Sequence, residues 1–190
     1  MFALTKQKSL EDYLRRILEN EGKYVANMKN AAVLVPLSLH KNLYITFIKR
    51  SKRLRFHRGE IAFPGGLQED DENPVETALR EAWEELKIQK NDVVILGFLP
   101  PTKTLTTNIH IIPVVGLIPF NYPFKPNTNE IERVLQIPVK DLYKNVYEDL
   151  FGKYYLYRGY RIWGATARIL TNLLSRLKKI INNSPHGYFI

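Results

Sequence analysis

The stretch from Gly65 to Ile88 constrains this chain more than any other part of it. It reads GGLQEDDENPVETALREAWEELKI. Asn73 is a good helix N-cap residue, Pro74 suits the first helical position, and Glu76 stands three residues after the cap. No further Gly or Pro interrupts the run to Leu86. The spacing therefore predicts a helix that begins soon after a glycine-rich turn.

One side of this predicted helix carries three carboxylates. At about 100° per residue, Glu81, Glu84 and Glu85 share an arc of about 100°. The apolar residues fall beside that arc and form the expected buried stripe, which consists of Val75, Ala78, Leu79, Ala82, Trp83 and Leu86. The acids therefore flank the surface that packs against the rest of the protein.

Grouping these acids has an electrostatic cost, which separates two interpretations. On a solvated face, like charges four residues apart cost about 0.2–0.5 kcal/mol per pair, and Arg80 and Lys87 offset part of it. In a cleft with an effective dielectric near 20, each close pair repels by about 4 kcal/mol. A divalent cation would remove that repulsion, and Mg²⁺ fits best because it binds a few carboxylates and leaves room for water and phosphate. The acids alone leave both interpretations open.

The complete pattern resembles the signature box of the Nudix hydrolases, which cleave a diphosphate joined to another moiety. The matching positions are Gly66, Glu72, Arg80, Glu81, Glu84, Glu85 and Ile88. One position departs, because Lys87 stands where the family usually has a Gly that closes the last helical turn. A left-handed Lys costs roughly 1 kcal/mol, unless the helix end is built differently. The departure concerns the cap and leaves the metal chemistry untouched.

The Nudix resemblance implies roles for these residues. The expected ligands of Mg²⁺ or Mn²⁺ are Glu81, Glu84, Glu85 and the carbonyl of Gly66, with Glu72 at an outer metal or stabilising the junction between loop and helix. Arg80 is expected to orient a box carboxylate through a charge-assisted hydrogen bond. Nudix enzymes often place a mobile acidic loop near residues 127–132. Glu130 is therefore the candidate for positioning or deprotonating the attacking water, Glu132 is the fallback, and plain loop charge remains open for either.

A second informative stretch runs from Thr46 to Gly66 and reads TFIKRSKRLRFHRGEIAFPGG. Between Lys49 and Arg58, six of ten residues are Lys or Arg. Composition alone fits either a solvated loop or an RNA-binding face. The spacing resembles the motif found upstream of the box in the coenzyme A diphosphatase branch of the Nudix family. Its positions here are Arg50-Ser51, Arg55, Gly59 and Phe63-Pro64-Gly65-Gly66.

The resemblance to this branch implies a small-molecule nucleotide substrate that carries a diphosphate and a separate 3′-phosphate. Arg recognises phosphate through planar, bidentate contacts, and Gly allows close approach of the backbone. The expected substrate-binding residues are Arg50, Arg55, His57, Arg58, Gly65 and Gly66. Cleavage of coenzyme A would give 3′,5′-ADP and 4′-phosphopantetheine.

Length and composition limit the number of domains, the compartment and the kind of partner. The chain has 190 residues, is 45% hydrophobic and shows no break in composition, so we expect one domain over 1–190, with a motif-bearing core at about 31–145 and a C-terminal hairpin and helix at 153–182. The absence of Cys excludes disulfides. No apolar run reaches about 18 residues and no secretory leader is evident, which predicts a cytoplasmic protein without a membrane span. A net charge of +9 suits a polyanionic partner, either a nucleotide-like ligand or nucleic acid.

Periodicity predicts further helices at 9–20, 138–142 and 166–181, strands at 31–37, 42–49, 93–99 and 109–118, and a hairpin at 154–163. Pro113 suggests an edge or a bulge in its strand. This mixture is α/β, and the resemblance implies a Nudix-type α/β/α sandwich with a mixed β-sheet. The helix at 166–181 either covers the sheet or forms a homodimer face, and the sequence leaves both open.

Three rival functions remain at this stage. The first is hydrolysis of another nucleoside diphosphate derivative, such as ADP-ribose or a nucleoside triphosphate, which needs the metal site but no 3′-phosphate contact. The second is processing of an RNA 5′ end, which the basic charge favours. The third is a non-catalytic module that binds a ligand or RNA, against which the complete set of box acids argues.

Overall fold

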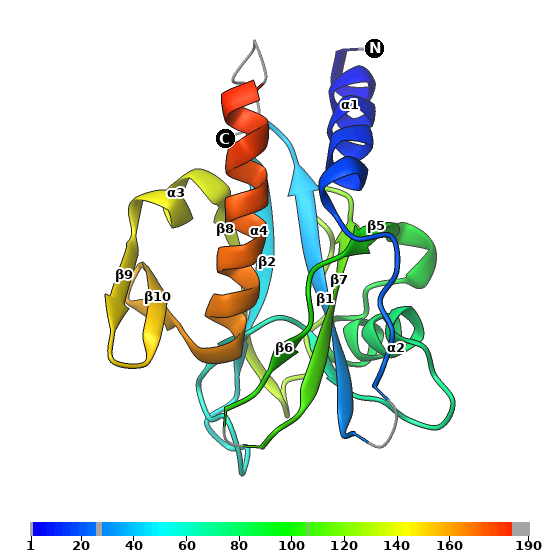
Figure 1. Ribbon diagram of the computed structural model, residues 1–190. Helices are drawn as coiled ribbons and strands as arrows, with labels where there is room; N and C mark the ends of the chain where they lie inside the picture. Colours follow the sequence, from blue (N-terminus) through cyan, green and yellow to red (C-terminus); the bar gives the residue numbers. More distant parts are fainter. Residues whose placement is uncertain (1, 26–27, 106, 184–190) are drawn as a thin grey trace.

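The computed structural model describes residues 2–25, 28–105 and 107–183 (Figure 1). The helices are α1 (Phe2–Ile17), α2 (Pro74–Leu86), the 3-10 helix η1 (Lys90–Asp92), α3 (Val139–Lys144) and α4 (Gly164–Asn183). The strands are β1 (Asn30–Leu39), β2 (Leu43–Arg50), β3 (Ile61–Ala62), β4 (Gly65–Leu67), β5 (Val94–Phe98), β6 (Thr102–Lys103), β7 (His110–Leu117), β8 (Ile131–Pro138), β9 (Val146–Asp149), β10 (Gly152–Tyr157) and β11 (Tyr160–Ile162). Within the described residues, β1 to β8 form one mixed sheet and β9 to β11 form a small antiparallel one.

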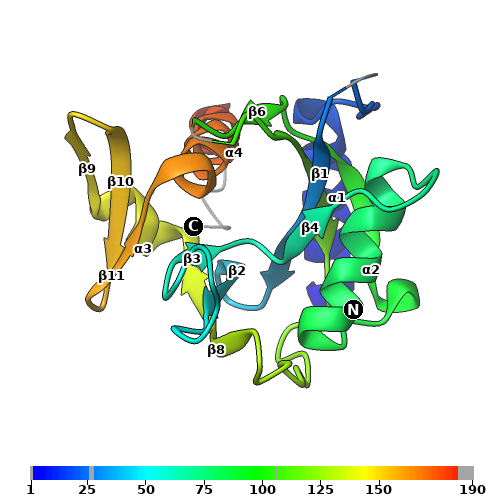
Figure 2. The same cartoon turned by 90° about the horizontal axis from the view of Figure 1, so that it is seen from below.

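The large sheet divides beside β1. On one side of β1, β7 runs parallel to it from the Asn30–His110 pair to the Leu37–Leu117 pair. On the other side the partner changes along the strand, because β4 pairs with the first part of β1 and β2 pairs with its end. Strands β1 and β2 therefore diverge away from their shared end. The segment 61–67 connects them there, because β3 pairs with β2 and β4 pairs with β1 (Figure 2).

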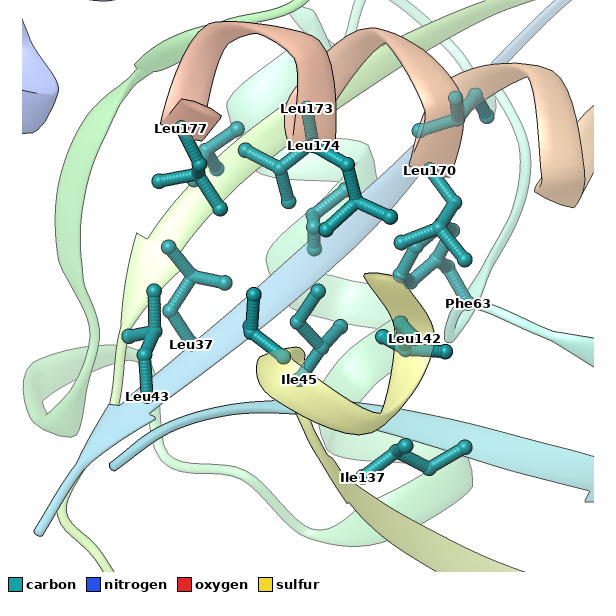
Figure 3. Close-up of a cluster of buried hydrophobic side chains, with 14 of the residues drawn as sticks. Leu37, Leu43, Ile45, Phe63, Ile137, Leu142, Leu170, Leu173, Leu174 and Leu177 are labelled. Carbon is teal, nitrogen blue, oxygen red and sulfur yellow. The ribbon is translucent and has the colours of Figure 1, made fainter. Parts of the chain in front are cut away.

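Helices cover both faces of this sheet. Ala78, Ala82 and Leu86 of α2 pack with β1 side chains in one buried cluster. The helices α1 and α4 contribute to a second cluster on the other face. Figure 3 shows the side chains of α4 directed at the sheet and at α3; they are Leu170, Leu173, Leu174 and Leu177, facing Leu37, Ile45 and Leu142. The predicted α/β/α sandwich with a mixed sheet is confirmed, and α4 covers the sheet.

The predicted start of α2 is confirmed in detail. Asn73 accepts hydrogen bonds from the N–H groups of Val75 and Glu76, and the Glu76 carboxylate accepts from the Asn73 N–H, which completes a capping box. At the other end Lys87 is left-handed, with φ 58° and ψ 31°, and its N–H points to the carbonyls of Ala82 and Trp83. Lys87 therefore takes the conformation in which Gly is usual.

Two predictions about other elements need correction, and several strands were not predicted. The helix expected at 9–20 begins at Phe2 and ends at Ile17, because the backbone of Glu19 instead exchanges hydrogen bonds with Phe98 of β5. Pro113 does not mark an edge, since β7 lies between β1 and the strands β5 and β6. Its missing N–H is tolerated where the partner changes from β6 to β5. The strands that the sequence did not predict are β3, β4, β6, β8 and β9.

The C-terminal hairpin is confirmed. Tyr157 pairs with Tyr160 across a turn in which Arg158 and Gly159 both have positive φ, the conformation of a two-residue hairpin loop. The predicted helix after it is also present, as α4. The tail beyond Asn183 lies outside the described residues.

Candidate active site

Helix α2 turns Glu85 and Glu81 toward the sheet, whereas Glu84 stays exposed to solvent. Its buried residues are Pro74, Thr77, Ala78, Ala82, Glu85 and Leu86. The predicted stripe is therefore partly wrong, because Trp83 is 46% exposed whereas Glu85 is 2% exposed. The helix turns the side that carries Glu81 and Glu85 toward strand β4. This is possible because β4 contributes Gly65 and Gly66, which have no side chains to occupy that space. Trp83 instead lies outside, with the Lys87 ammonium 3.6 Å from its ring centre.

Two glycines form the wall against which these carboxylates lie. The N–H of Gly65 donates a hydrogen bond of 3.1 Å to Oε2 of Glu85. A Cβ built on Gly66 would stand 2.1 Å from Oε1 of Glu81, so no larger residue fits there while Glu81 keeps its place. Gly66 itself pairs with Ala32 of β1, which fixes this wall to the sheet.

Glu85 is a buried carboxylate close to other charges. Burial raises its pKa to about 8; Arg50 and the Gly65 N–H oppose that shift, and the charges of Glu81 and Glu130 add to it. Nη1 of Arg50 lies 3.6 Å from Oε1 of Glu85. The pKa of Glu81 is raised as well, mainly by burial, against the influence of Arg80. Burial thus disfavours the charged form of both carboxyl groups.

Arg80 connects the other acids of the box. Its Nε donates to Oε1 of Glu72 at 2.8 Å, and its Nη1 lies 3.0 Å from Oε1 of Glu81 and 3.4 Å from Oε2 of Glu84. Glu72 also accepts a hydrogen bond from the Thr77 hydroxyl, and the Arg80 bond lowers the pKa of its carboxyl. Glu72 therefore joins the loop to α2, and Arg80 orients the carboxylates around it.

The donor set suits a hard divalent cation. Carboxylate and carbonyl oxygens are the ligands that Mg²⁺ and Mn²⁺ take. In the part of the chain that the structure describes, no three acidic or His side chains are already gathered as a metal-binding group, and Arg80 stands among Glu72, Glu81 and Glu84. Burial is the main cause of the raised pKa values of Glu81 and Glu85, and a bound cation would stabilise their charged forms.

The structure separates the two acids of the 127–132 loop. The carbonyl of Glu130 accepts a hydrogen bond of 2.7 Å from the N–H of Ser51, and the charge of Glu130 contributes to the raised pKa values on α2. Glu132 points elsewhere and forms an ion pair of 2.6 Å with Lys49. Of the two candidates, Glu130 is the one beside the box acids.

Sequence reasoning passed over Asn127. Its backbone N–H donates to the carbonyl of Glu85 at 2.8 Å, and its Nδ2 lies 3.2 Å from Oε1 of Glu130. In the sequence Asn127 is one polar residue in a polar loop, and only its closeness to Glu130 hints at a role.

Backbone hydrogen bonds to Arg50 close the base of the basic loop 51–58. The Arg50 N–H donates to the carbonyl of Glu60, and the N–H of Gly59 donates to the carbonyl of Arg50. These bonds hold the loop 51–58 at the end of β2 that carries Arg50 toward Glu85. Nε of Arg50 is buried and has no hydrogen-bond partner among the described residues.

The other predicted phosphate ligands do not reach the box acids. All three side chains are exposed on the loop. Nδ1 of His57 lies 3.0 Å from Glu60, and Nε of Arg58 donates to the carbonyl of Leu54. The Arg55 guanidinium lies 5.2 Å from the ring centre of Phe56. Of the four predicted basic residues, only Arg50 stands beside Glu85.

Comparison with known proteins agrees with this site. The NUDIX domain family matches residues 28–158. A protein named uncharacterized Nudix hydrolase NudL from Yersinia pestis (strain Pestoides F) is 34% identical over 175 residues, which cover 85% of this chain and 86% of that relative. A protein of the same name from Yersinia pseudotuberculosis serotype O:1b matches equally well.

Solved structures agree at the level of the fold. A Caenorhabditis elegans Ap4A hydrolase aligns with a TM-score of 0.57 at 14% identity, covering 83% of this chain and 100% of that one. A NUDIX hydrolase from Nitrosomonas europaea aligns with a TM-score of 0.55 at 19% identity, covering 88% of this chain and 78% of that one.

Fold and site together define a hydrolase of phosphate anhydrides. The chain belongs to the Nudix hydrolase family, and it acts on diphosphate linkages. Among the described helices, none is long and apolar enough to pass through a lipid bilayer.

Proposed function

We propose that this Nudix hydrolase cleaves the diphosphate of coenzyme A or its acyl derivatives. The products would be 3′,5′-ADP and 4′-phosphopantetheine or its acylated form. The observation that carries the proposal is the position of Arg50, which begins the basic loop and also lies 3.6 Å from Glu85. The end of β2 therefore places Arg50 beside the box acids, and the loop that follows carries further basic side chains at a distance from them. This arrangement suits a substrate with a diphosphate and a separate phosphate.

The residues that would hold Mg²⁺ or Mn²⁺ are Glu81, Glu84, Glu85 and the carbonyl of Gly66, with Glu72 further out. When bound, the metal supplies positive charge that neutralises the diphosphate and acidifies the attacking water. The wall formed by Gly65 and Gly66 keeps the carboxylates in place, and Arg80 orients those of Glu81 and Glu84.

The reaction is the addition of water across a P–O–P bond. The water oxygen forms a new bond to one phosphorus, and the bridging oxygen leaves with the other phosphoryl group. The proton lost by the water passes to the carboxylate of Glu130, which acts as the general base, and then to solvent. On the substrate side, Arg50 faces the diphosphate, and Arg55, with His57 and Arg58 beside it, receives the 3′-phosphate.

The experiment compares coenzyme A with 3′-dephospho-coenzyme A in the presence of Mg²⁺, Mn²⁺ or EDTA, with products identified by mass spectrometry. We expect metal-dependent release of 3′,5′-ADP and phosphopantetheine, and a clearly lower kcat/KM for the dephospho form. Equal kcat/KM for the two substrates would remove the role of the basic loop. No cleavage of either would remove coenzyme A, and ADP-ribose, nucleoside triphosphates and triphosphorylated RNA would then be screened.

A non-catalytic module is the remaining alternative. It predicts binding of these ligands without metal-dependent turnover of any of them. The complete set of box acids, two of which have raised pKa values, speaks for catalysis.

A further inference from the structure

Asn127 ties the loop that carries Glu130 to the helix that carries the box acids. Its N–H donates a 2.8 Å hydrogen bond to the carbonyl of Glu85. Its carbonyl accepts from the N–H groups of Glu130, at 3.0 Å, and Ile131, at 2.7 Å. The backbone of this one residue thus anchors the loop on α2 and also closes the turn in which Glu130 lies.

The side chain of Asn127 makes a second pair of contacts inside the same turn. Its Oδ1 accepts from the N–H of Asn129 at 3.2 Å, and its Nδ2 donates to Oε1 of Glu130 at 3.2 Å. Because a backbone N–H can only donate, the amide oxygen must face Asn129, and the amide nitrogen is left for the carboxylate. An Asp could keep the first contact but would lose the second.

Glu130 is also held from the opposite side. Its carbonyl accepts from the N–H of Ser51 at 2.7 Å, and Ser51 directly follows Arg50. The turn is therefore fixed both to α2 and to the end of β2, the two elements that bring Glu85 and Arg50 together. Oε1 is engaged by Asn127, and among the described residues no hydrogen-bond donor is found for the other carboxylate oxygen.

We propose that Asn127 is a positioning residue, which holds the Glu130 carboxylate in register with the acids of α2 so that Glu130 can take a proton from the attacking water. The inference rests on the proposed function, in which Glu130 is the general base. Its physical basis is that a base misplaced by about 1 Å can lower turnover by about 10²-fold, although substrate still binds.

The test compares Asn127→Asp with Asn129→Asp. Both add one negative charge to the same loop, but Asn129 is exposed and only its backbone N–H takes part in the turn. With the diphosphate substrate found in the screen and Mg²⁺, we expect N127D to lower kcat by about 10–100-fold with little change in KM. N129D should keep the wild-type kcat. Both variants should remain folded by circular dichroism and keep the wild-type rise in Tm with Mg²⁺; a folded N127D with normal kcat would overturn the inference.

A second comparison shows whether Asn127 acts through Glu130. In a Glu130→Ala background, N127D should cause no further loss of kcat, whereas an additional loss as large as in the wild type would overturn the inference. If E130A alone keeps normal kcat, the base assigned in the proposed function is wrong. If E130A loses turnover and N127D does not, only the inference about Asn127 fails.

The contact can also be measured without a substrate. Thermal unfolding of N127A, E130A and the double variant should show a combined decrease in Tm that is smaller than the sum of the two single decreases. Additive decreases would mean that the two side chains do not interact in solution, and the inference would fail whatever the substrate is.

Discussion

The backbone of Gly66 lies directly against the carboxylate of Glu81, so that an added Cβ would come within 2.1 Å of Oε1. This contact joins the glycine-rich turn to the acidic helix. The glycine is required here by space rather than by φ, because Gly66 is not among the residues with positive φ. A change as small as one methyl group therefore tests the geometry of the site.

Gly66→Ala should lower kcat by about 10²-fold, because the new methyl group displaces the Glu81 carboxylate. The matched control is Leu67→Ala, which changes the exposed neighbour in the same strand. Steady-state kinetics, together with circular dichroism to confirm the fold, checks this. Full activity in a folded G66A protein would contradict the proposed position of Glu81.

Glu85→Gln should abolish most turnover, by about 10²–10³-fold, because it removes a charged ligand from the proposed metal site. It should also remove most of the rise in Tm that Mg²⁺ causes in the wild type. The control is Glu148→Gln, in the exposed strand β9. If E85Q responds to Mg²⁺ like the wild type, Glu85 does not bind the metal.

The stability of the metal-free protein should fall as pH rises. The pKa of Glu85 is about 8 in the folded state, against an ordinary value of 4.5, so the folded protein holds this proton more tightly than the unfolded chain. Stability from this group is complete below about pH 4.5 and is lost as the pH rises to about 8, by on the order of a few kcal/mol. Urea denaturation in EDTA at several pH values measures it. The E85Q variant should show a flatter profile, and identical profiles would exclude Glu85 as the cause.

Arg55→Ala should raise KM for coenzyme A by about 10-fold, because a charge-assisted hydrogen bond to phosphate contributes about 1.5–3 kcal/mol. KM for 3′-dephospho-coenzyme A should not change. Arg53→Ala removes the same charge from the same loop and is the control for a general electrostatic effect. Equal effects of R55A on both substrates would show that Arg55 does not contact the 3′-phosphate.

Lys87→Gly and Lys87→Met should have opposite effects on stability. Gly relieves a left-handed conformation that costs about 1–2 kcal/mol, and this outweighs loss of the contact with Trp83, worth about 0.5–1 kcal/mol. Met keeps the strained backbone and loses the cation. Denaturant unfolding should therefore place K87G at or above the wild type and K87M below it. The reverse order would mean that the αL strain is negligible here.

Local signals explain what could be predicted about the box helix. The capping box of Asn73 and Glu76 and the position of Pro74 depend on neighbours in the chain, and the structure contains them as expected. The exposure of Trp83 was not predictable in this way. It depends on how α2 is rotated, and that rotation follows from the space above Gly65 and Gly66 in a different element.

Long-range contacts account for the other differences. Asn127 meets Glu85 only because the fold returns the chain to α2 after more than forty residues, and no periodic pattern marks that meeting. The same holds for Pro113, whose surroundings depend on where β5 and β6 end. Arg50 was expected to bind phosphate, but its closeness to Glu85 was not predicted. The exposed loop that carries the remaining basic side chains is one of the two interpretations that composition left open.

The loop 52–58 lies between Ser51, whose N–H donates to the carbonyl of Glu130, and Gly59, whose N–H donates to the carbonyl of Arg50. Its length and its side chains can therefore change while both bonds persist, without any shift of α2 or its acids. The loop proposed to recognise the substrate is thus structurally separable from the hydrolytic centre, so exchanging it would alter substrate choice and leave that centre unchanged.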